Sequence, residues 1–410
     1  MEHYNKNNIN ILIEQTPKTP RMSVSFFFKI HKKEKYFGLN SLLARLLLQG
    51  TKKYSAAQLA DLFENQCIDI TSKAKQDYLK LSMVFLNEDF KTALELIKEL
   101  ILNSTFDEYK KEIYKMKNEI ICDLDNPKFK LTDCFIKTIF DNHPYSSTHT
   151  KILADIDKIS KEDIIEAHKE LLKSYKSIVF VGDYENKNEL IDYLSNFSFM
   201  ESFNRQDEID NIFTPYYKED RLIFIEKNDV AQAQILQGWL VDSFDSSLSV
   251  KYSVLNNILG ASGLSSRLFV NLRDKQGLAY TVRSQYETLL HSGIFNLYIG
   301  SAPKNIKKSL LGFESELQKL ADESPSKEEL QGAKENISGR LKYFSQNNSQ
   351  INAVQGYNYM MNLGLDYRER FLEQINKVSA QDVSSMAQKL LSTPKLTVII
   401  APGEFRNLCS

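Results

Sequence analysis

The chain has 410 residues, enough for two or more domains at roughly 100 to 200 residues each. Hydrophobic residues make up 42% and charged residues 26%, which is the composition of a folded globular protein and excludes a disordered or collagenous chain. The 52 Lys and Arg residues nearly cancel the 53 Asp and Glu residues, so no overall field attracts nucleic acid or an anionic membrane.

The predicted elements of the first half begin with strands and continue with helices. Residues 8–15 and 21–30 are predicted as strands, 38–50 as a helix and 67–86 as a hairpin, followed by three or four helices. The second half repeats this order. It has strands at 222–227 and 233–241, a helix from Val250, a strand pair at 278–290 and 292–302, and helices to Leu391. Strands grouped before helices favour an α+β sandwich, with helices covering one sheet face, over a doubly wound fold.

An internal repeat supports two homologous domains. An offset of 219 positions aligns residues 156–182 with residues 375–401 without a gap. Each copy is predicted to be a capped helix followed by a buried strand, and the capping residues Ser160 and Asp163 recur as Ser379 and Asp382. The sequence therefore predicts an N-terminal domain at 1–200, a linker at 201–220 and a C-terminal domain at 221–410.

The cysteines and the N-terminal residues indicate the cellular compartment of the protein. The four cysteines lie far apart and form no CxxC pair, which argues against a zinc knuckle or a redox pair. The N-terminus has no apolar stretch of signal-peptide length, and nowhere do about 18 uncharged apolar residues run together. We therefore expect free thiols, a cytoplasmic location and no membrane partner.

Residues 38–51, GLNSLLARLLLQGT, resemble the zinc-site helix of the pitrilysin/insulinase superfamily of metallopeptidases, in the short-chain branch that includes processing peptidases. In that family an HxxEH motif places two His ligands on one helical face, with the general base Glu between them. This chain has Ser41, Ala44 and Arg45 at the three motif positions. A guanidinium group never deprotonates and repels a metal ion, so we expect no zinc site and no catalytic residues for zinc chemistry here.

A second segment resembles the helix that carries the family's third zinc ligand. Residues 106–127 match the family pattern E-I-x4-D-x-P from Glu119 onward, which places Glu112 near the ligand position. A lone carboxylate makes no zinc site, so the residues favour a solvated Glu112 or one paired with Arg45. His143 and His149 have no anionic third ligand nearby in sequence, and we expect them to be structural.

The second half carries a more specific resemblance. Residues 259–287, LGASGLSSRLFVNLRDKQGLAYTVRSQYE, resemble a family segment whose Arg and Tyr reach toward the zinc site and hold the substrate. Arg273 and Tyr280 occupy those positions. An Arg offers a fork of donors to a peptide carbonyl or carboxylate, and a Tyr hydroxyl can donate to an oxyanion. The residues alone also fit an Arg in a helix-end salt bridge and a Tyr in the core.

Two features point to peptide binding without fixing its place. A sheet with a free edge can bind an extended peptide as an added strand, and either strand 292–300 or the first-domain hairpin is a candidate. The segment from Gly260 to Gly263 fits a flexible loop near the cleft or a turn between helices.

The resemblance covers nearly the whole chain and implies the LuxS/processing-peptidase-like fold: two homologous α+β domains, each a mostly antiparallel sheet with helices packed on one face. Some members of that branch divide the HxxEH motif and the Arg/Tyr pair between two chains. This chain keeps only the second part. We therefore predict a noncatalytic, substrate-binding subunit of a heterodimeric zinc metalloendopeptidase that acts on peptides or unfolded segments. It would be inactive alone and hold no cofactor, because a homologous HxxEH-containing partner supplies the zinc.

The alternative function is a peptidase-like pseudoenzyme that serves as a structural or peptide-binding homodimer without proteolysis. A third hypothesis, an active enzyme with a novel site, has no His/Glu constellation to support it.

Overall fold

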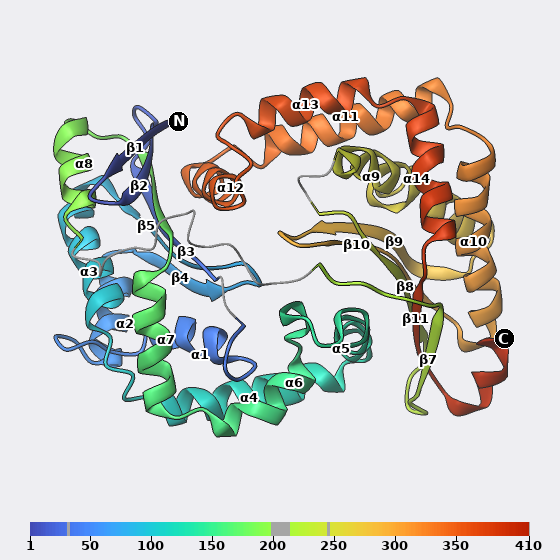
Figure 1. Ribbon diagram of the computed structural model, residues 1–410, viewed down its shortest axis with the longest axis horizontal. Helices are drawn as coiled ribbons and strands as arrows, with labels where there is room; N and C mark the ends of the chain where they lie inside the picture. The colour runs from blue at the N-terminus through green and yellow to red at the C-terminus, as the bar shows by residue number, and fades with distance from the viewer. Residues whose placement is uncertain (31–32, 198–213, 244–246, 410) are drawn as a thin grey trace. The chain divides into compact units, whose positions relative to one another are not determined.

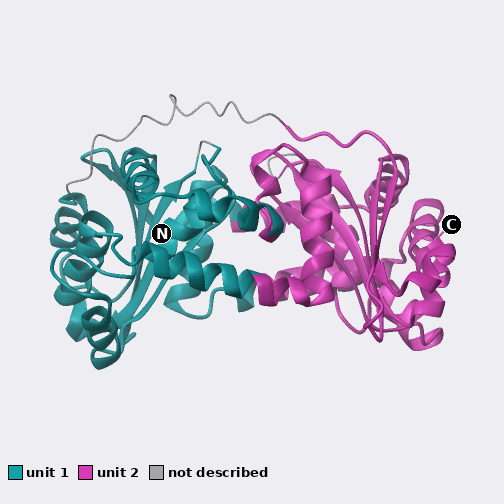
Figure 2. Ribbon diagram, turned by 90° about the horizontal axis from the view of Figure 1, so that it is seen from below, with its two compact units in different colours: residues 1–120, 150–212, 342–367 teal, residues 121–149, 213–341, 368–410 magenta. Residues whose placement is uncertain are grey.

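The computed structural model describes residues 1–30, 33–197, 214–243 and 247–409 (Figure 1). The predicted linker at 201–220 lies mostly outside these residues. The chain forms two compact units, coloured separately in Figure 2. Unit 1 comprises residues 1–120, 150–212 and 342–367, and unit 2 comprises residues 121–149, 213–341 and 368–410.

Unit 1 is built on a six-stranded sheet with the order β1-β2-β6-β3-β5-β4, in which only β2 and β6 pair in parallel. The strands are β1 (Glu2–Lys6), β2 (Ile9–Gln15), β3 (Arg21–Lys29), β4 (Asp69–Ala74), β5 (Tyr78–Leu86) and β6 (Lys176–Gly182). The helices are α1 (Leu39–Leu46), α2 (Ala56–Asn65), α3 (Phe90–Asn103), most of α4 (Tyr109–Asp125), α6 (His149–Asp155), α7 (Lys161–Lys173), α8 (Lys187–Ser195) and α12 (Asn348–Met360). The predicted hairpin at 67–86 corresponds to β4 and β5.

Unit 2 is built on a five-stranded sheet with the order β7-β11-β8-β10-β9, in which only β11 and β7 pair in parallel. The strands are β7 (Arg221–Glu226), β8 (Ala233–Val241), β9 (Ala279–Thr288), β10 (Gly293–Ser301) and β11 (Leu396–Ala401). The helices are α5 (Pro127–Phe140), α9 (Leu248–Asn256), the π-helices η5 (Asn257–Ala261) and η6 (Phe269–Lys275), α10 (Ile306–Asp322), most of α11 (Lys327–Tyr343), α13 (Tyr367–Lys377), α14 (Ala380–Ser392) and the 3-10 helix η8 (Gly403–Cys409).

The repeat found in the sequence is a repeat of structure. The helix–strand pair α7–β6 corresponds to α14–β11, and both helices begin with a complete capping box. The amide of Asp163 donates to Ser160 Oγ over 3.1 Å, and Asp382 repeats this bond to Ser379 at 3.1 Å. The sheets also correspond, with β2-β6-β3-β5-β4 matching β7-β11-β8-β10-β9. Two homologous α+β domains are therefore present, as predicted.

The compact units exchange a pair of equivalent helices. The offset of 219 positions carries α5 onto residues 346–359, close to α12. Yet α5, from the first half of the chain, packs on β8 and β11 of unit 2, and α12, from the second half, packs on β3 and β6 of unit 1. Asn352 fixes α12 to its sheet, since its Nδ2 atom donates to the carbonyls of Ser23 (3.0 Å) and Val179 (2.8 Å).

This exchange refines two sequence expectations. The boundaries 1–200 and 221–410 describe the repeat along the chain, whereas each compact unit also takes a helix from the other half. The predicted layer of helices covers one face of each sheet, and the exchanged helix lies on the opposite face. In unit 2 this gives two core clusters, one between α5 and the sheet and the other beneath α9, α10 and α14.

The strand orders show which strands form the edges of the two sheets. Strand β10 is paired on both sides, by β8 and β9, so the expectation that strand 292–300 offers a free edge is wrong. The edge strands are β1 and β4 in unit 1 and β7 and β9 in unit 2.

Within the described residues, no helix has the length and apolar character needed to cross a bilayer.

Candidate functional site

Helix α1 presents the degenerate zinc motif. It begins after Gly38, whose φ of 92° is a left-handed conformation that suits glycine, and a Cβ atom there would lie 2.8 Å from Ile152. The helix buries its Leu residues and Ala44 in the core. Ser41 and Arg45, one turn apart, are partly exposed on the same side. The residues at two of the three motif positions are therefore accessible.

Arg45 is paired with two carboxylates of α4. Its Nη1 atom donates to Glu119 Oε1 over 3.3 Å, and its Nη2 atom pairs with the other oxygen of the same carboxylate. The Nη1 atom also lies 3.7 Å from Glu112 Oε2. On the far side of Glu112, Lys115 Nζ donates to Oε1 over 2.6 Å. We call these four residues, Arg45, Glu112, Lys115 and Glu119, the Arg45 cluster.

The electrostatics of the Arg45 cluster are balanced. Glu112 is only 3% exposed, so its charge needs the two cations beside it. The hydrogen bonds from the Arg45 guanidinium hold the pKa of Glu119 below its ordinary value, because they favour the ionised carboxylate. The cluster thus ties α1 to α4 through charge-assisted hydrogen bonds.

The residues present do not fit a zinc ion. Ser41 and Ala44 offer no imidazole or carboxylate, and the Arg45 guanidinium stands against both carboxylates that face α1. In the described ranges, no group of three His, Cys, Asp or Glu side chains is arranged to hold a metal ion. The pairing of Arg45 with Glu112 agrees with the sequence interpretation. The sequence did not predict that Glu119 pairs more closely with Arg45, although Glu119 lies two turns after Glu112 and so shares its helical face.

His143 is a buried core residue, whereas His149 is partly exposed. The His143 ring is fully buried, and its Nδ1 atom accepts the backbone N–H of Tyr145 over 3.1 Å. It packs against the rings of Phe140 and Tyr145. His149 Nε2 lies 4.0 Å from a carboxylate oxygen of Asp123.

Arg273 and Tyr280 form a second feature, in unit 2. The π-helix η6 places Phe269 and Arg273 one turn apart, and the guanidinium carbon lies 4.4 Å from the Phe269 ring centroid and 5.3 Å from that of Tyr280. The helix ends at Lys275, and the turn that follows contains Gly277, whose φ is 61° and whose N–H donates to the Arg273 carbonyl over 2.9 Å. This turn leads directly into edge strand β9 and Tyr280.

The sequence also allowed Arg273 to form a helix-end salt bridge and Tyr280 to lie in the core, and the structure shows neither arrangement among the described residues. Tyr280 is 76% exposed, so it does not fill the core. Among the residues that the structure describes, Arg273 makes no ion pair or hydrogen bond through its side chain, and its contacts are with the two rings. Phe269, the third member of this stack, was not identified from the sequence, although its i, i+4 spacing from Arg273 on a helix is a usable signal.

Of the two alternatives for the segment from Gly260 to Gly263, a flexible loop or a turn between helices, the position of Gly263 fits the turn, whereas Gly260 fits neither. Gly260 lies inside the π-helix η5 and is buried against β9, where a Cβ atom would meet the Ser284 nitrogen at 2.2 Å. It therefore allows close packing of helix on strand and is not part of a loop. Gly263 follows in the turn with a φ of 85° and open space around it.

Two models of one protein family match most of the chain. Residues 10–149 match the family model "Insulinase (Peptidase family M16)", and residues 158–337 match "Peptidase M16 inactive domain". The chain belongs to peptidase family M16. The Arg45 cluster lies within the first matched region, and Arg273 and Tyr280 lie within the second. The resemblance recognised from the sequence is confirmed.

Relatives of this M16 protein extend over nearly its whole length. It is 22% identical to an uncharacterized zinc protease, YmxG, of Bacillus subtilis, with 97% of each chain covered. It is 24% identical to a non-peptidase homolog, YmxG, of Helicobacter pylori, covering 90% of this chain and 85% of the relative. The crystal structure of a peptidase M16 inactive domain from Pseudomonas fluorescens superimposes with a TM-score of 0.86 at 20% identity, covering 98% of both chains. The protein is thus a peptidase-like M16 member whose degenerate motif holds an ion-pair cluster.

Proposed function

We propose that this protein is a noncatalytic, substrate-binding subunit of a heterodimeric zinc metalloendopeptidase that acts on peptides or unfolded segments. The observation that carries the proposal is the Arg45 cluster. A guanidinium group paired with Glu112 and Glu119 stands where a metal would need ligands, so hydrolysis requires zinc and a general base from another chain. A homologous partner with an intact HxxEH motif would provide both.

The unit 2 pair supports substrate binding. Arg273 carries a full charge between two aromatic rings, which leaves its fork of donors for a peptide carbonyl or carboxylate. The exposed Tyr280 hydroxyl can donate to the oxyanion that develops at a scissile carbonyl. In this role both residues bind and position the substrate, while the partner supplies the nucleophile.

Edge strands provide a way to bind an extended peptide. Strand β4 contacts α1, the helix of the Arg45 cluster, and has a free edge in the sheet of unit 1. Strand β9, which begins beside Tyr280, has a free edge in unit 2. An added strand would bind through main-chain hydrogen bonds, which select an unfolded segment more than a particular sequence.

The test is reconstitution with the HxxEH-containing M16 protein of the same cell. We expect the purified chain to cleave no peptide and the mixture to cleave an unstructured peptide. A partner variant with the motif Glu changed to Gln is the control for the source of activity. Peptide cleavage by this chain alone, after its metal content is shown to be negligible, would contradict the proposal.

We place the complex in the cytoplasm, which is supported by the four free cysteines among the described residues.

A second candidate is a homodimeric pseudoenzyme that binds peptides or supports an assembly without proteolysis. The observation that favours it is the relative from Helicobacter pylori, a non-peptidase homolog. The two candidates differ in their partner. A stable complex with an HxxEH-containing chain supports the heterodimer, whereas a homodimer that ignores that chain supports the pseudoenzyme.

A further inference from the structure

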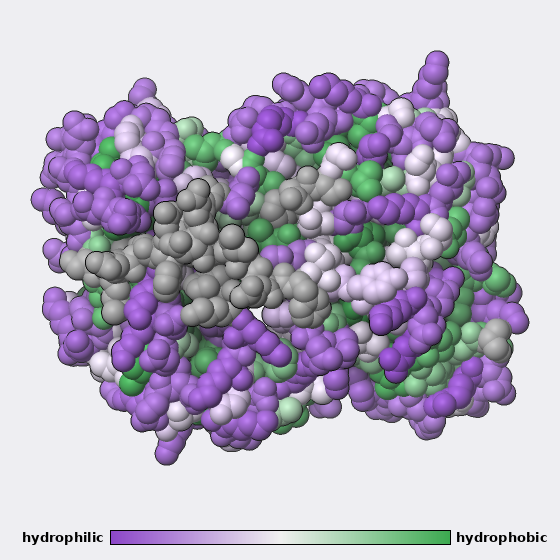
Figure 3. Space-filling view, in the orientation of Figure 1, coloured by the Kyte–Doolittle hydropathy of each residue, from purple (hydrophilic) through white to green (hydrophobic). Residues whose placement is uncertain are grey.

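An apolar groove lies within unit 2, between α10 and the side of the sheet formed by β7, β11 and β8. It has a volume of about 460 Å³, and leucines from β7, α10, α14 and η8 line it. Two of them are exposed, Leu222 by 43% and Leu311 by 55%. Figure 3 shows hydrophobic side chains gathered near β7 on a face that is otherwise mostly hydrophilic. Apolar side chains that gather at a surface groove are typical of an interaction site.

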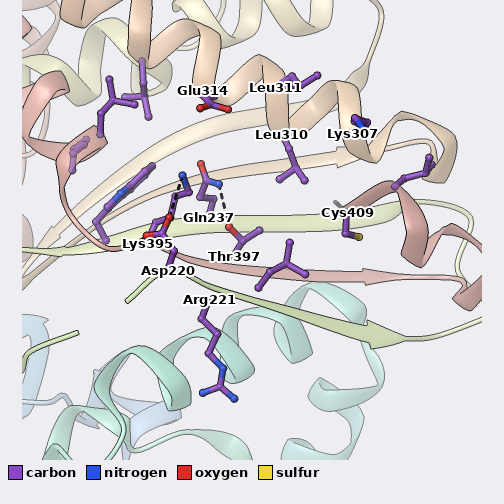
Figure 4. Close-up of a pocket in the computed structure, with 16 residues that line it drawn as sticks. Asp220, Arg221, Gln237, Lys307, Leu310, Leu311, Glu314, Lys395, Thr397 and Cys409 are labelled. Carbon is purple, nitrogen blue, oxygen red and sulfur yellow. Dashed lines mark hydrogen bonds and ion pairs between the residues drawn. The ribbon is translucent and has the colours of Figure 1, made fainter. Parts of the chain in front are cut away.

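Two pairs of polar groups on the sheet side of the groove are satisfied within the chain. Gln237 Nε2 donates to Thr397 Oγ1 over 3.1 Å, and Lys395 Nζ lies 3.5 Å from Asp220 Oδ2, as Figure 4 shows. Figure 4 also shows the Arg221 side chain pointing away from the other labelled residues. The charges of α10 are therefore the ones that decide what this groove binds.

Helix α10 has a counterpart in unit 1, helix α3. Each begins directly after a three-residue 3-10 helix, η7 (Pro303–Asn305) before α10 and η1 (Asn87–Asp89) before α3, so the two helices match at an offset of 216 positions. In unit 1 the chain itself covers this face. Lys98 of α3 donates to the Asn196 carbonyl over 3.4 Å, and its Nζ lies 5.7 Å from the Phe197 ring centroid. Residues that follow α8 thus cover α3.

The same offset shows how α10 differs from α3. Glu314 takes the position of Lys98, and Leu311 takes the position of Glu95. Leu311, Glu314 and Glu95 are all exposed. Water solvates a carboxylate well and an aliphatic side chain poorly, so the exchange of Glu95 for Leu311 makes this face costly to leave exposed. Together with the groove, the exposed leucine indicates that this face of α10 packs against another surface.

Four residues of α10 line the groove with helical spacing. Lys307, Leu310, Leu311 and Glu314 follow the i, i+3, i+4, i+7 pattern and so share one face of the helix, as Figure 4 shows. The two leucines lie at the centre of this face, with a cation at one end and an anion at the other. Among the described residues, neither Lys307 nor Glu314 forms an ion pair or a side-chain hydrogen bond.

This order of residues is complementary to itself in an antiparallel helix pair. Positions 307 and 314 are centred on the same point as positions 310 and 311. A twofold axis through that point therefore places Leu310 opposite Leu311 of a second copy, and Lys307 opposite Glu314 of that copy. The symmetry repeats both contacts. The contact then pairs every one of the four charges and removes the leucines from water.

We propose that this face binds a second copy of the chain, with α10 antiparallel to α10 of that copy. Leu310 and Leu311 of both copies form the apolar centre of the contact, and two Lys307–Glu314 ion pairs flank it. The residues that line the groove include no member of the Arg45 cluster or of the Arg273–Tyr280 pair. The inference therefore does not depend on the proposed function and leaves both features free for a different partner.

Charge reversal tests the pairing. Sedimentation velocity of the full chain should show monomer giving way to dimer as its concentration rises to about 100 μM. Lys307→Glu and Glu314→Lys each place like charges in both contacts, and each should weaken the dimer at least about tenfold. An equal mixture of the two variants should restore the dimer, because one variant then carries two negative charges at these positions and the other two positive charges.

Controls separate this contact from other modes of association. Lys377→Glu, at an exposed position in the same unit, should leave the dimer intact. Leu311→Asp should weaken the dimer at least about tenfold, whereas Leu264→Asp, at a position that is 73% exposed, should not. Circular dichroism verifies that each variant is folded. A chain that stays monomeric at every concentration would overturn the proposal, as would a dimer that the charge reversals leave unchanged or that their mixture fails to restore.

Discussion

Arg45 in α1 and Glu119 in α4 face each other across two helices that lie far apart in sequence. The Nη1 atom of Arg45 donates to Glu119 Oε1 over 3.3 Å, and the same guanidinium lies 3.7 Å from the buried Glu112 carboxylate. The Arg45 guanidinium therefore connects the two helices through both carboxylates.

The first prediction concerns the stability supplied by Arg45. Arg45→Ala should lower the free energy of unfolding by about 1–3 kcal/mol, because Glu112 stays buried with one cation fewer. Urea denaturation measures the change. The double variant Arg45→Ala/Glu112→Gln should be less destabilised than the sum of the single variants, since the glutamine carries no charge. Additive effects would show that the two residues are not coupled.

The second prediction concerns metal binding. Metal analysis of the purified chain should find no stoichiometric zinc, because positions 41, 44 and 45 supply no ligand. The triple substitution Ser41→His/Ala44→Glu/Arg45→His should gain about one zinc per chain, because the carboxylates of Glu112 and Glu119 both face position 45. Adding Glu119→Gln to this variant is the matched control and should weaken zinc binding. A tightly bound zinc in the unmodified chain would refute the interpretation of the motif.

The third prediction concerns Arg273 and Tyr280 in the reconstituted complex. Arg273→Ala should lower kcat/KM for peptide cleavage by about tenfold or more, the size expected for a lost hydrogen bond between charged groups. Tyr280→Phe should lower kcat more than it raises KM, because its hydroxyl acts on the developing oxyanion. Lys275→Ala, at an exposed neighbouring position on the same helix, is the control. Activity that is insensitive to both substitutions would remove them from the site.

The fourth prediction concerns acid stability. Burial raises the pKa of Asp382, but hydrogen bonds from Lys251 and from Ser379 outweigh it and lower the pKa to about 2. The lowered pKa means that this stabilisation is complete above the ordinary value of 3.8 and is lost as the pH falls toward 2. Asp382→Asn should therefore lower stability at pH 7 by about 1 kcal/mol, the usual contribution of a helix cap.

Thermal melts between pH 7 and pH 2 measure this difference. The difference in stability between Asp382→Asn and the parent chain should shrink as the pH falls from about 4 toward 2, because the carboxyl takes up a proton in the unfolded parent chain near its ordinary pKa of 3.8 and in the folded chain only near 2. Asp274→Asn, at an exposed position, should behave like the parent throughout. A difference in melting temperature that stays constant with pH would show that the substitution acts through the shape of the side chain and not through its charge.

The fifth prediction compares the effect on stability of replacing two helical glycines by alanine. Gly260→Ala places a methyl group 2.2 Å from the Ser284 nitrogen and should cost about 3 kcal/mol, because backbone stands on the other side of the contact. Gly339→Ala, in α11 with open space around the new methyl group, should stabilise the protein by about 0.5–1 kcal/mol through helix propensity. Similar effects of the two substitutions in urea denaturation would contradict this packing.

The sequence predicted the local elements because each leaves a local signal. The alternation of β5 is visible in the chain, where Leu79, Leu81, Met83 and Phe85 are buried. The capping boxes at Ser160 and Ser379 were predicted because their partners lie three residues away. Strand β1, which follows no strong apolar pattern, was not predicted.

Some features of the candidate site were also predicted from the sequence, and others were not. Motif position identified Ser41, Ala44, Arg45, Arg273 and Tyr280, and the pairing of Glu112 with Arg45 was one of the two alternatives that the sequence left open. The bond to Glu119 and the stacking on Phe269 depend on rotamers, which a motif does not specify. The sequence left Gly260 open between a flexible loop and a turn, because its close contact, Ser284, lies on another element.

By itself the sequence determined the repeat, the α+β class, the missing zinc ligands and the two motif regions, because each is written in residue type and short-range spacing. Only the tertiary structure decided which strands form the sheet edges, the exchange of α5 and α12 between the units, and the groove beside α10. Many of the contacts behind those features join residues more than a hundred positions apart, as in the Gln237–Thr397 pair. Such contacts depend on how whole elements pack, and local propensity carries no record of that packing.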